Sequence, residues 1–92
     1  MEIRSIGIIG AGTMGNGIAQ VAAGAGFDVI LLDINDAALE KGLAALSKSL
    51  DRLIKKESIT SEQKAQTLAR IKTTTLYTDL AAVSLVIEAA TE

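Results

Sequence analysis

The amino-acid sequence predicts an α/β fold in which short parallel strands alternate with helices. Three observations favour it. Short apolar segments lie near the start of the chain, an apolar stripe with helical spacing runs from 39 to 53, and two more strand-like segments lie near the end. Short, nearly continuous apolar strands are typical of parallel sheets that are buried on both faces. The predicted order is β-α-β-α-α-β-turn-β, with right-handed crossovers.

The first third of the chain contains two predicted strands and one helix. Residues 3–9 are rich in isoleucine and lead into the first glycines, so we expect a buried strand there. A helix of small residues is predicted over 13–23, and the glycines of segment 24–26 supply its stop signal. Residues 27–32 predict a second buried strand that ends at Asp33. One face of the predicted helix is expected to be apolar: Ile18, Ala19, Val21 and Ala22.

A helical hairpin is predicted over 37–70, longer than a minimal crossover between strands requires. Its first helix begins after Asn35 or Asp36, either of which can cap it. Leucines that alternate at spacings of four and three residues form an apolar stripe on this helix: Leu39, Leu43, Leu46, Leu50 and Leu53. The second helix begins at Thr60-Ser61-Glu62-Gln63, which resembles a capping box, and continues to about Arg70.

The last part of the chain predicts two more strands. Residues 73–76, which begin with three β-branched threonines, predict a third strand. Residues 79–83 predict a short helical or turn connection, and 85–87 predict a fourth strand that ends at Glu88-Ala89. We expect the strand order 3-2-1-4, part of a doubly wound sheet with the hairpin inserted. The fourth strand is then an edge strand, and its apolar side chains predict self-association or fraying there.

Composition excludes several classes of function. The 92 residues suffice for one small domain, and 49% of them are hydrophobic. The net charge of -2 is not that of a nucleic-acid-binding domain. No apolar run approaches the ~20 residues of a membrane span, and the N-terminus does not resemble a signal peptide, so we expect a cytoplasmic protein. Without cysteine or histidine, we expect no catalytic residue and no metal site in this chain.

The segment Gly10-Ala11-Gly12-Thr13-Met14-Gly15, called the glycine loop below, fits the pattern G-x-G-x-x-G. A predicted strand precedes it, a helix opens within it, and Asp33 ends the next strand about 20 residues later, which is the context of a dinucleotide-binding Rossmann fold. In that fold Gly10 makes the tight turn, Gly12 lets a pyrophosphate approach the backbone, and Gly15 lets the helix pack closely. The alternative is that these are ordinary turn glycines and that Asp33 caps a helix.

Asp33 predicts which dinucleotide is bound. Its carboxylate can accept hydrogen bonds from the hydroxyls of the adenosine ribose. The 2′-phosphate of NADP would instead bring like charges about 4 Å apart, which costs roughly 4 kcal/mol at an effective dielectric constant of about 20. Asp33 is followed by Ile34-Asn35-Asp36, with no arginine or lysine to compensate. NAD is therefore the predicted cofactor.

The residues from Ile8 to Gln20, followed by Leu31-Leu32-Asp33, resemble the N-terminus of the 3-hydroxyacyl-CoA dehydrogenase family, and of its free-standing bacterial 3-hydroxybutyryl-CoA dehydrogenases in particular. The hairpin over 37–70 and the segment 85–92 are also similar, so the resemblance covers the whole chain. Ser84 departs from the family pattern, in which an aspartate is expected. The family oxidises a (3S)-3-hydroxyacyl-CoA to the 3-ketoacyl-CoA with NAD, in fatty-acid or butyrate-type metabolism.

The resemblance implies roles for individual residues. The glycine loop would contact the pyrophosphate of NAD and Asp33 the adenosine ribose. Ala89 and Glu92 match positions near the nicotinamide half of the cofactor. Ser49 and Lys56 match positions that contact the CoA moiety of the acyl-CoA substrate, where a lysine suits a phosphate-bearing ligand.

Alternatives remain at several of these positions. Lys56 also fits a solvated helix face that it would share with Arg52 and Lys55, and Ser49 fits an ordinary exposed serine. Glu88 could simply cap backbone groups at the end of its strand.

The catalytic residues of the family are absent from this chain. In the family, the catalytic histidine, its glutamate partner, and the serine and asparagine that orient the substrate carbonyl lie further along. We therefore expect the chain to be the N-terminal piece of a larger, homo-oligomeric enzyme and to be inactive alone. Two other hypotheses stay open: a non-catalytic nucleotide-binding or regulatory module, and another Rossmann dehydrogenase for small hydroxy acids, which would leave the hairpin and Lys56 unexplained.

Overall fold

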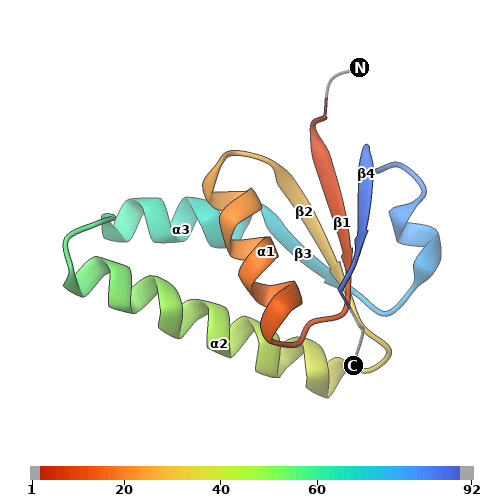
Figure 1. Ribbon diagram of the computed structural model, residues 1–92, viewed down its shortest axis with the longest axis horizontal. Coiled ribbons are helices and arrows are strands. Elements are labelled where there is room, and N and C mark those ends of the chain that lie inside the picture. Colours follow the sequence, from red (N-terminus) through yellow and green to blue (C-terminus); the bar gives the residue numbers. More distant parts are fainter. Residues whose placement is uncertain (1–2, 90–92) are drawn as a thin grey trace.

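The computed structural model describes residues 3–89 and contains a four-stranded parallel sheet with helices packed on it (Figure 1). The strands lie in the order β3-β2-β1-β4, which confirms the predicted topology. No helix in residues 3–89 is long and apolar enough to cross a membrane. The elements are, in chain order, β1 (Ser5–Ile9), α1 (Thr13–Gly24), β2 (Asp28–Leu32), α2 (Asp36–Lys55), α3 (Ser61–Ala69), β3 (Ile71–Thr74), a 3-10 turn η1 (Tyr77–Leu80) and β4 (Leu85–Glu88).

Strand β1 occupies an inner position and sets the register of the sheet. Its Ile8 is aligned with Leu31 of β2 on one side and with Ile87 of β4 on the other. Because the strands are parallel, their carboxyl ends meet at one edge, where the backbone continues to pair. The N–H of Gly10 donates to the oxygen of Leu32 at 2.7 Å. The glycine loop and the residue after β2 are thus brought together.

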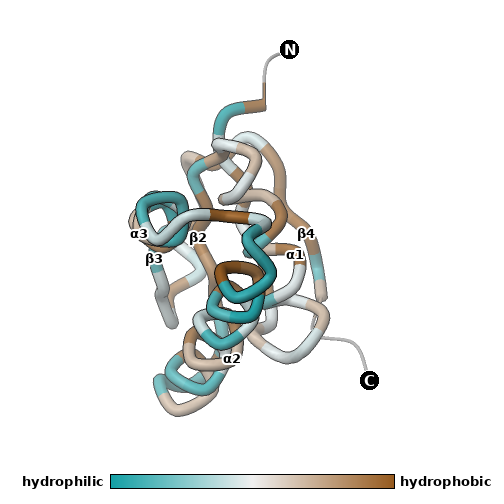
Figure 2. The backbone as a smooth tube through the Cα atoms, turned by 90° about the vertical axis from the view of Figure 1, so that its left-hand side faces the viewer, coloured by the Kyte–Doolittle hydropathy of each residue, from teal (hydrophilic) through white to brown (hydrophobic). Residues whose placement is uncertain are grey.

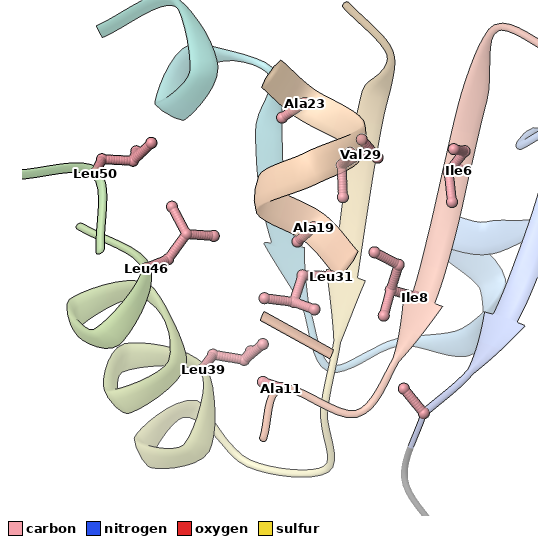
Figure 3. Packing of buried hydrophobic residues seen from close by; sticks show 12 residues of the cluster. Ile6, Ile8, Ala11, Ala19, Ala23, Val29, Leu31, Leu39, Leu46 and Leu50 are labelled. Atoms are coloured by element: carbon pink, nitrogen blue, oxygen red, sulfur yellow. The ribbon is translucent and has the colours of Figure 1, made fainter. Parts of the chain in front are cut away.

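The hydrophobic core lies between the sheet, α1 and α2. Alanines of α1, including Ala19 and Ala23, are fully buried and allow this helix to lie close to the strands (Figure 3). Leu39, Leu46 and Leu50 of α2 are buried and point toward α1 and β2 in Figure 3. Figure 2 shows hydrophilic and hydrophobic residues alternating along α2, as its leucine stripe predicts.

The helix ends follow the local sequence signals. The side chain of Asn35, not that of Asp36, caps α2 and accepts the N–H of Ala38 at 2.7 Å. The predicted capping box at the start of α3 is confirmed. The N–H of Gln63 donates to Oγ1 of Thr60 at 3.1 Å, and the N–H of Thr60 donates to Oε1 of Gln63 at 2.8 Å.

Two expectations about the local structure are wrong. Val21 does not face the core with Ala19 and Ala22 but is 74% exposed, because each residue turns a helix by about 100° and the buried face of α1 is already filled by alanines. The third strand begins at Ile71 rather than at residue 73 and ends at Thr74. It forms directly after α3, since pairing with β2 begins where Val29 donates to the oxygen of Arg70 at 2.8 Å.

Ser84, the departure from the family pattern, joins the starts of β1 and β4. Its Oγ accepts the N–H of Arg4 at 3.2 Å and that of Ser5 at 3.4 Å. Its own N–H donates to the oxygen of Ser5 at 3.1 Å. A hydroxyl oxygen therefore serves as the acceptor at this position, and the fourth strand forms as predicted.

Candidate dinucleotide-binding site

Two glycines of the glycine loop are required by the backbone itself. Gly10 has a φ of 107°, in the region that side chains rarely permit. At Gly15 an added Cβ would lie far inside 3.0 Å of the carbonyl oxygen of Gly10, a separation that real Cβ atoms essentially never show. The chain therefore leaves β1 through a tight turn and brings the first turn of α1 directly onto it.

The middle glycine and the start of α1 face open space. Gly12 is the N-cap of α1 and supplies no side-chain cap, and the first turn of the helix carries no acidic residue. An added Cβ on Gly12 would meet nothing within 4 Å. The first amides of a helix lack partners within it, and the helix end carries a partial positive charge. This space, bounded by free amides, fits the diphosphate of a dinucleotide.

Asp33 faces the glycine loop. Its Oδ2 accepts the N–H of Ala11 at 2.8 Å, and its Oδ1 accepts the N–H of Ile34 at 2.6 Å. Each carboxylate oxygen keeps a second lone pair, so the half-buried group can still accept the hydroxyls of a ribose. The alternative in which Asp33 caps the following helix is wrong, because Asn35 occupies that position.

A cavity of about 320 Å³ joins Asp33 to Gly12 and Thr13. The N-terminal half of α2 forms its opposite wall, and Asn16 of α1 also lines it. The lining residues on α2 are Ala38, Lys41, Gly42 and Ala45. The sequence motif gives no signal for this wall, since the residues lie beyond the strand-loop-helix unit that defines it.

Gly42 sets how closely α2 approaches the glycine loop. An added Cβ at Gly42 would lie 2.6 Å from the oxygen of Ala11 and 3.1 Å from its Cβ. Figure 3 shows Ala11 beside Leu39. Leu39 lies on α2, about one turn before Gly42. Helix α2 thus packs directly on the backbone that would receive the pyrophosphate.

The remaining predicted site residues lie in three different places. Ala89 is buried beside the glycine loop and donates its N–H to the oxygen of Ile9 at 2.8 Å. Glu92 lies outside the described residues. Ser49 is half-buried and Lys56 is exposed at the C-cap of α2, about 10 Å and about 21 Å along the helix from Gly42 at 1.5 Å per residue. Neither of these two lines the cavity beside Asp33.

This fold and this site define a dinucleotide-binding domain of the Rossmann type. A family model described as "3-hydroxyacyl-CoA dehydrogenase, NAD binding domain" matches residues 5–92. The chain belongs to this family, and its cofactor class is NAD, as predicted. The family match also decides against the alternative of another Rossmann dehydrogenase for small hydroxy acids.

Known relatives agree in sequence and in structure. The crystal structure of (S)-3-hydroxybutyryl-CoA dehydrogenase from Ralstonia eutropha is 60% identical, with a TM-score of 0.96, and the match covers 99% of this chain and 32% of that one. The 3-hydroxybutyryl-CoA dehydrogenase of Bradyrhizobium diazoefficiens is 48% identical over 90 residues, covering 98% of this chain and 31% of that protein. A Psychrobacter protein named fatty acid oxidation complex subunit alpha is 37% identical over 91 residues, and the match covers 99% of this chain and 13% of that protein. The chain spans about a third of the length of the first two proteins.

Proposed function

We propose that this chain binds NAD as the N-terminal part of an enzyme that oxidises a (3S)-3-hydroxyacyl-CoA to the 3-ketoacyl-CoA. The observation that carries the proposal is the contact between Asp33 and the glycine loop at Ala11, because it places an acid for the ribose beside a bend open to the diphosphate. When bound, NAD supplies the acceptor for a hydride. The residues of this chain bind and orient it.

The proposed roles follow the geometry. The glycine loop, Gly10-Ala11-Gly12-Thr13-Met14-Gly15, contacts the pyrophosphate at the start of α1. The amides of residues 12–15 can donate to it, since those of Gly10 and Ala11 already donate to Leu32 and Asp33. Asp33 accepts the ribose hydroxyls, and its charge disfavours a 2′-phosphate. Ala89, which is hydrogen-bonded to Ile9 at the carboxyl end of the sheet, lies toward the nicotinamide half, and Glu92 is assigned to the same half.

The CoA moiety of the substrate is assigned to the outer part of α2. Lys56 presents an exposed ammonium group there, and Ser49 lies two turns earlier on the same helix. A lysine side chain binds phosphate as a flexible point charge. Support comes from the relatives, two of which are 3-hydroxybutyryl-CoA dehydrogenases and one a subunit of a fatty acid oxidation complex.

Titration of the 92-residue chain with NADH tests the cofactor assignment. We expect amide chemical shifts to move at 10–15 and at Asp33, with weak affinity because only part of the nucleotide cleft is supplied by this chain. NADPH should bind more weakly still, and acetoacetyl-CoA with NADH should give no turnover. If the amides of the glycine loop do not respond at millimolar NADH, the proposal is wrong.

The proposal that the chain is part of a larger protein has its own test in the coding sequence. A reading frame that continues past Glu92 into a histidine-containing segment and a helical domain supports the dehydrogenase. A stop at that point favours a non-catalytic nucleotide-binding module. The proposal includes a cytoplasmic location and a homo-oligomeric full-length enzyme, which cell fractionation and sedimentation of that enzyme would test.

Self-association through β4 is a further expected property of the isolated chain. Among the described strands β4 pairs only with β1, and Leu85 and Val86 are 40% and 47% exposed. An open strand edge with apolar side chains invites pairing with a second chain. We expect concentration-dependent sedimentation, together with amide protection at 85–89 that rises with concentration. A strictly monomeric species with strong protection there would contradict this prediction.

A further inference from the structure

One face of α2 turns toward the glycine loop, and it consists of small residues and one lysine. The residues of this face that line the cavity beside Asp33 are Ala38, Lys41, Gly42 and Ala45. Three of them are small, which leaves room for a ligand between α2 and the loop. Lys41 is the exception, since it brings a long cationic side chain to a wall that otherwise consists of alanine and glycine.

The backbone of α2 around Lys41 is held in place by packing. Gly42 lies against Ala11 so closely that no side chain fits between them. Figure 1 shows the N-terminal end of α2 beside the loop that joins β1 to α1. The start of the helix is held as well, by the Asn35 cap. Rotation of α2 that would carry Lys41 away from the cavity is therefore opposed at two points.

Lys41 has no ion-pair partner among the described residues. The described ion pair of α2 joins Asp51 to Lys64 of α3, at the other end of the helix. The carboxylate of Asp33, in the same cavity, instead accepts the backbone amides of Ala11 and Ile34. An ammonium group with no partner beside a ribose-binding acid can pair with an anion on that ribose.

We propose that Lys41 is a specificity-determining residue that gives this site a measurable affinity for NADPH, by pairing with a phosphate on the adenosine ribose. This inference rests on the proposed binding of a dinucleotide between the glycine loop and Asp33. Selection of the cofactor is then a balance between the repulsion from Asp33 and the attraction of Lys41. The residues directly after the second strand therefore do not determine the cofactor preference alone.

The test compares Lys41→Ala with the matched control Lys48→Ala in the 92-residue chain. Lys48 lies further along α2, is exposed, and does not line the cavity, so both variants change the net charge equally. Affinities for NADH and NADPH are measured by titration at low and high salt. A ribose phosphate carries up to about two negative charges, and its pair with Lys41 would be solvent-exposed. We therefore expect Lys41→Ala to lower the affinity for NADPH by about five- to tenfold.

The other measurements separate this inference from the proposed function. NADH affinity should change by less than about twofold in Lys41→Ala, and the NADPH effect should shrink at high salt because the pair is screened. Lys48→Ala should leave both affinities within about twofold. If NADH binds but the ratio of the two affinities is the same in Lys41→Ala and Lys48→Ala, the role of Lys41 is rejected and the NAD site stands. If neither dinucleotide binds the unaltered chain, the proposed function and this inference both fail.

Discussion

Replacing Gly15 with alanine is expected to cost at least about 3 kcal/mol of folding free energy, since overpacking beyond what a core can absorb reaches that size. The added methyl group would overlap the carbonyl oxygen of Gly10, a backbone atom that cannot rotate away. Gly10 is itself held, because its N–H donates to Leu32. Relief of the overlap therefore requires α1 to move off the sheet, which exposes its buried alanines.

Such a loss is a large part of the stability available to this chain. Native domains are stable by roughly 0.05–0.15 kcal/mol per residue, which for a chain of this length is about 5–14 kcal/mol. For a domain of this size each 1 kcal/mol lowers Tm by about 4–8 °C, so Gly15→Ala should melt at least about 12 °C lower. Thermal unfolding followed by far-ultraviolet circular dichroism measures the shift.

Gly17→Ala is the matched control. Gly17 lies on the same helix, but an added Cβ there meets nothing within 4 Å. In a helix interior, alanine is more favourable than glycine by about 1 kcal/mol. The control should therefore melt about 4–8 °C higher than the unaltered chain. Equal Tm values for the two variants would show that α1 does not pack on the loop as described.

The features that sequence predicts well are those that local residues determine. The capping box of Thr60 and Gln63, and a cap at the start of α2, can be recognised within four residues because the donor and acceptor lie on the same turn. The strand order follows from the doubly wound pattern that the glycine loop and the alternation of strands and helices indicate. The start of β3 differs from the predicted one because pairing with β2 determines where the strand begins. The β-branched run at 73–75 does not determine it.

The candidate site divides in the same way. The glycine loop and Asp33 are predicted because their spacing within one strand-helix-strand unit determines where they meet. The sequence does not mark Lys41 and Gly42 as site residues, since in sequence they are an ordinary lysine and an unfavourable helix glycine. Only the contact of Gly42 with Ala11 shows that this side of α2 forms a wall of the cavity. This wall is determined by packing between residues far apart in the sequence, which local patterns do not predict.

Replacing Asp33 with asparagine is expected to shift the cofactor preference strongly from NADH toward NADPH. The amide oxygen can still accept the N–H of Ala11, so the loop keeps its anchor, while the exposed Ile34 can find water for its own N–H. Loss of a charged acceptor for the ribose hydroxyls costs about 1.5 kcal/mol or more, so NADH should bind roughly tenfold more weakly. Removing the like-charge repulsion, worth up to about 4 kcal/mol, should raise the affinity for NADPH by at least about tenfold.

The expected change in the ratio of NADH to NADPH affinity is therefore about a hundredfold, obtained from parallel titrations of each variant. Asp36→Asn is the control, because it removes the same charge from an exposed residue at the start of α2 that does not line the cavity. It should change the ratio by less than about twofold, since an exposed charge outside the cavity is screened by salt. An Asp33→Asn ratio close to that of Asp36→Asn would mean that the carboxylate facing the glycine loop does not meet the ribose. The cofactor would then have to bind in another orientation, because the loop amides and the acid lie in one cavity and a dinucleotide in the expected orientation must contact both.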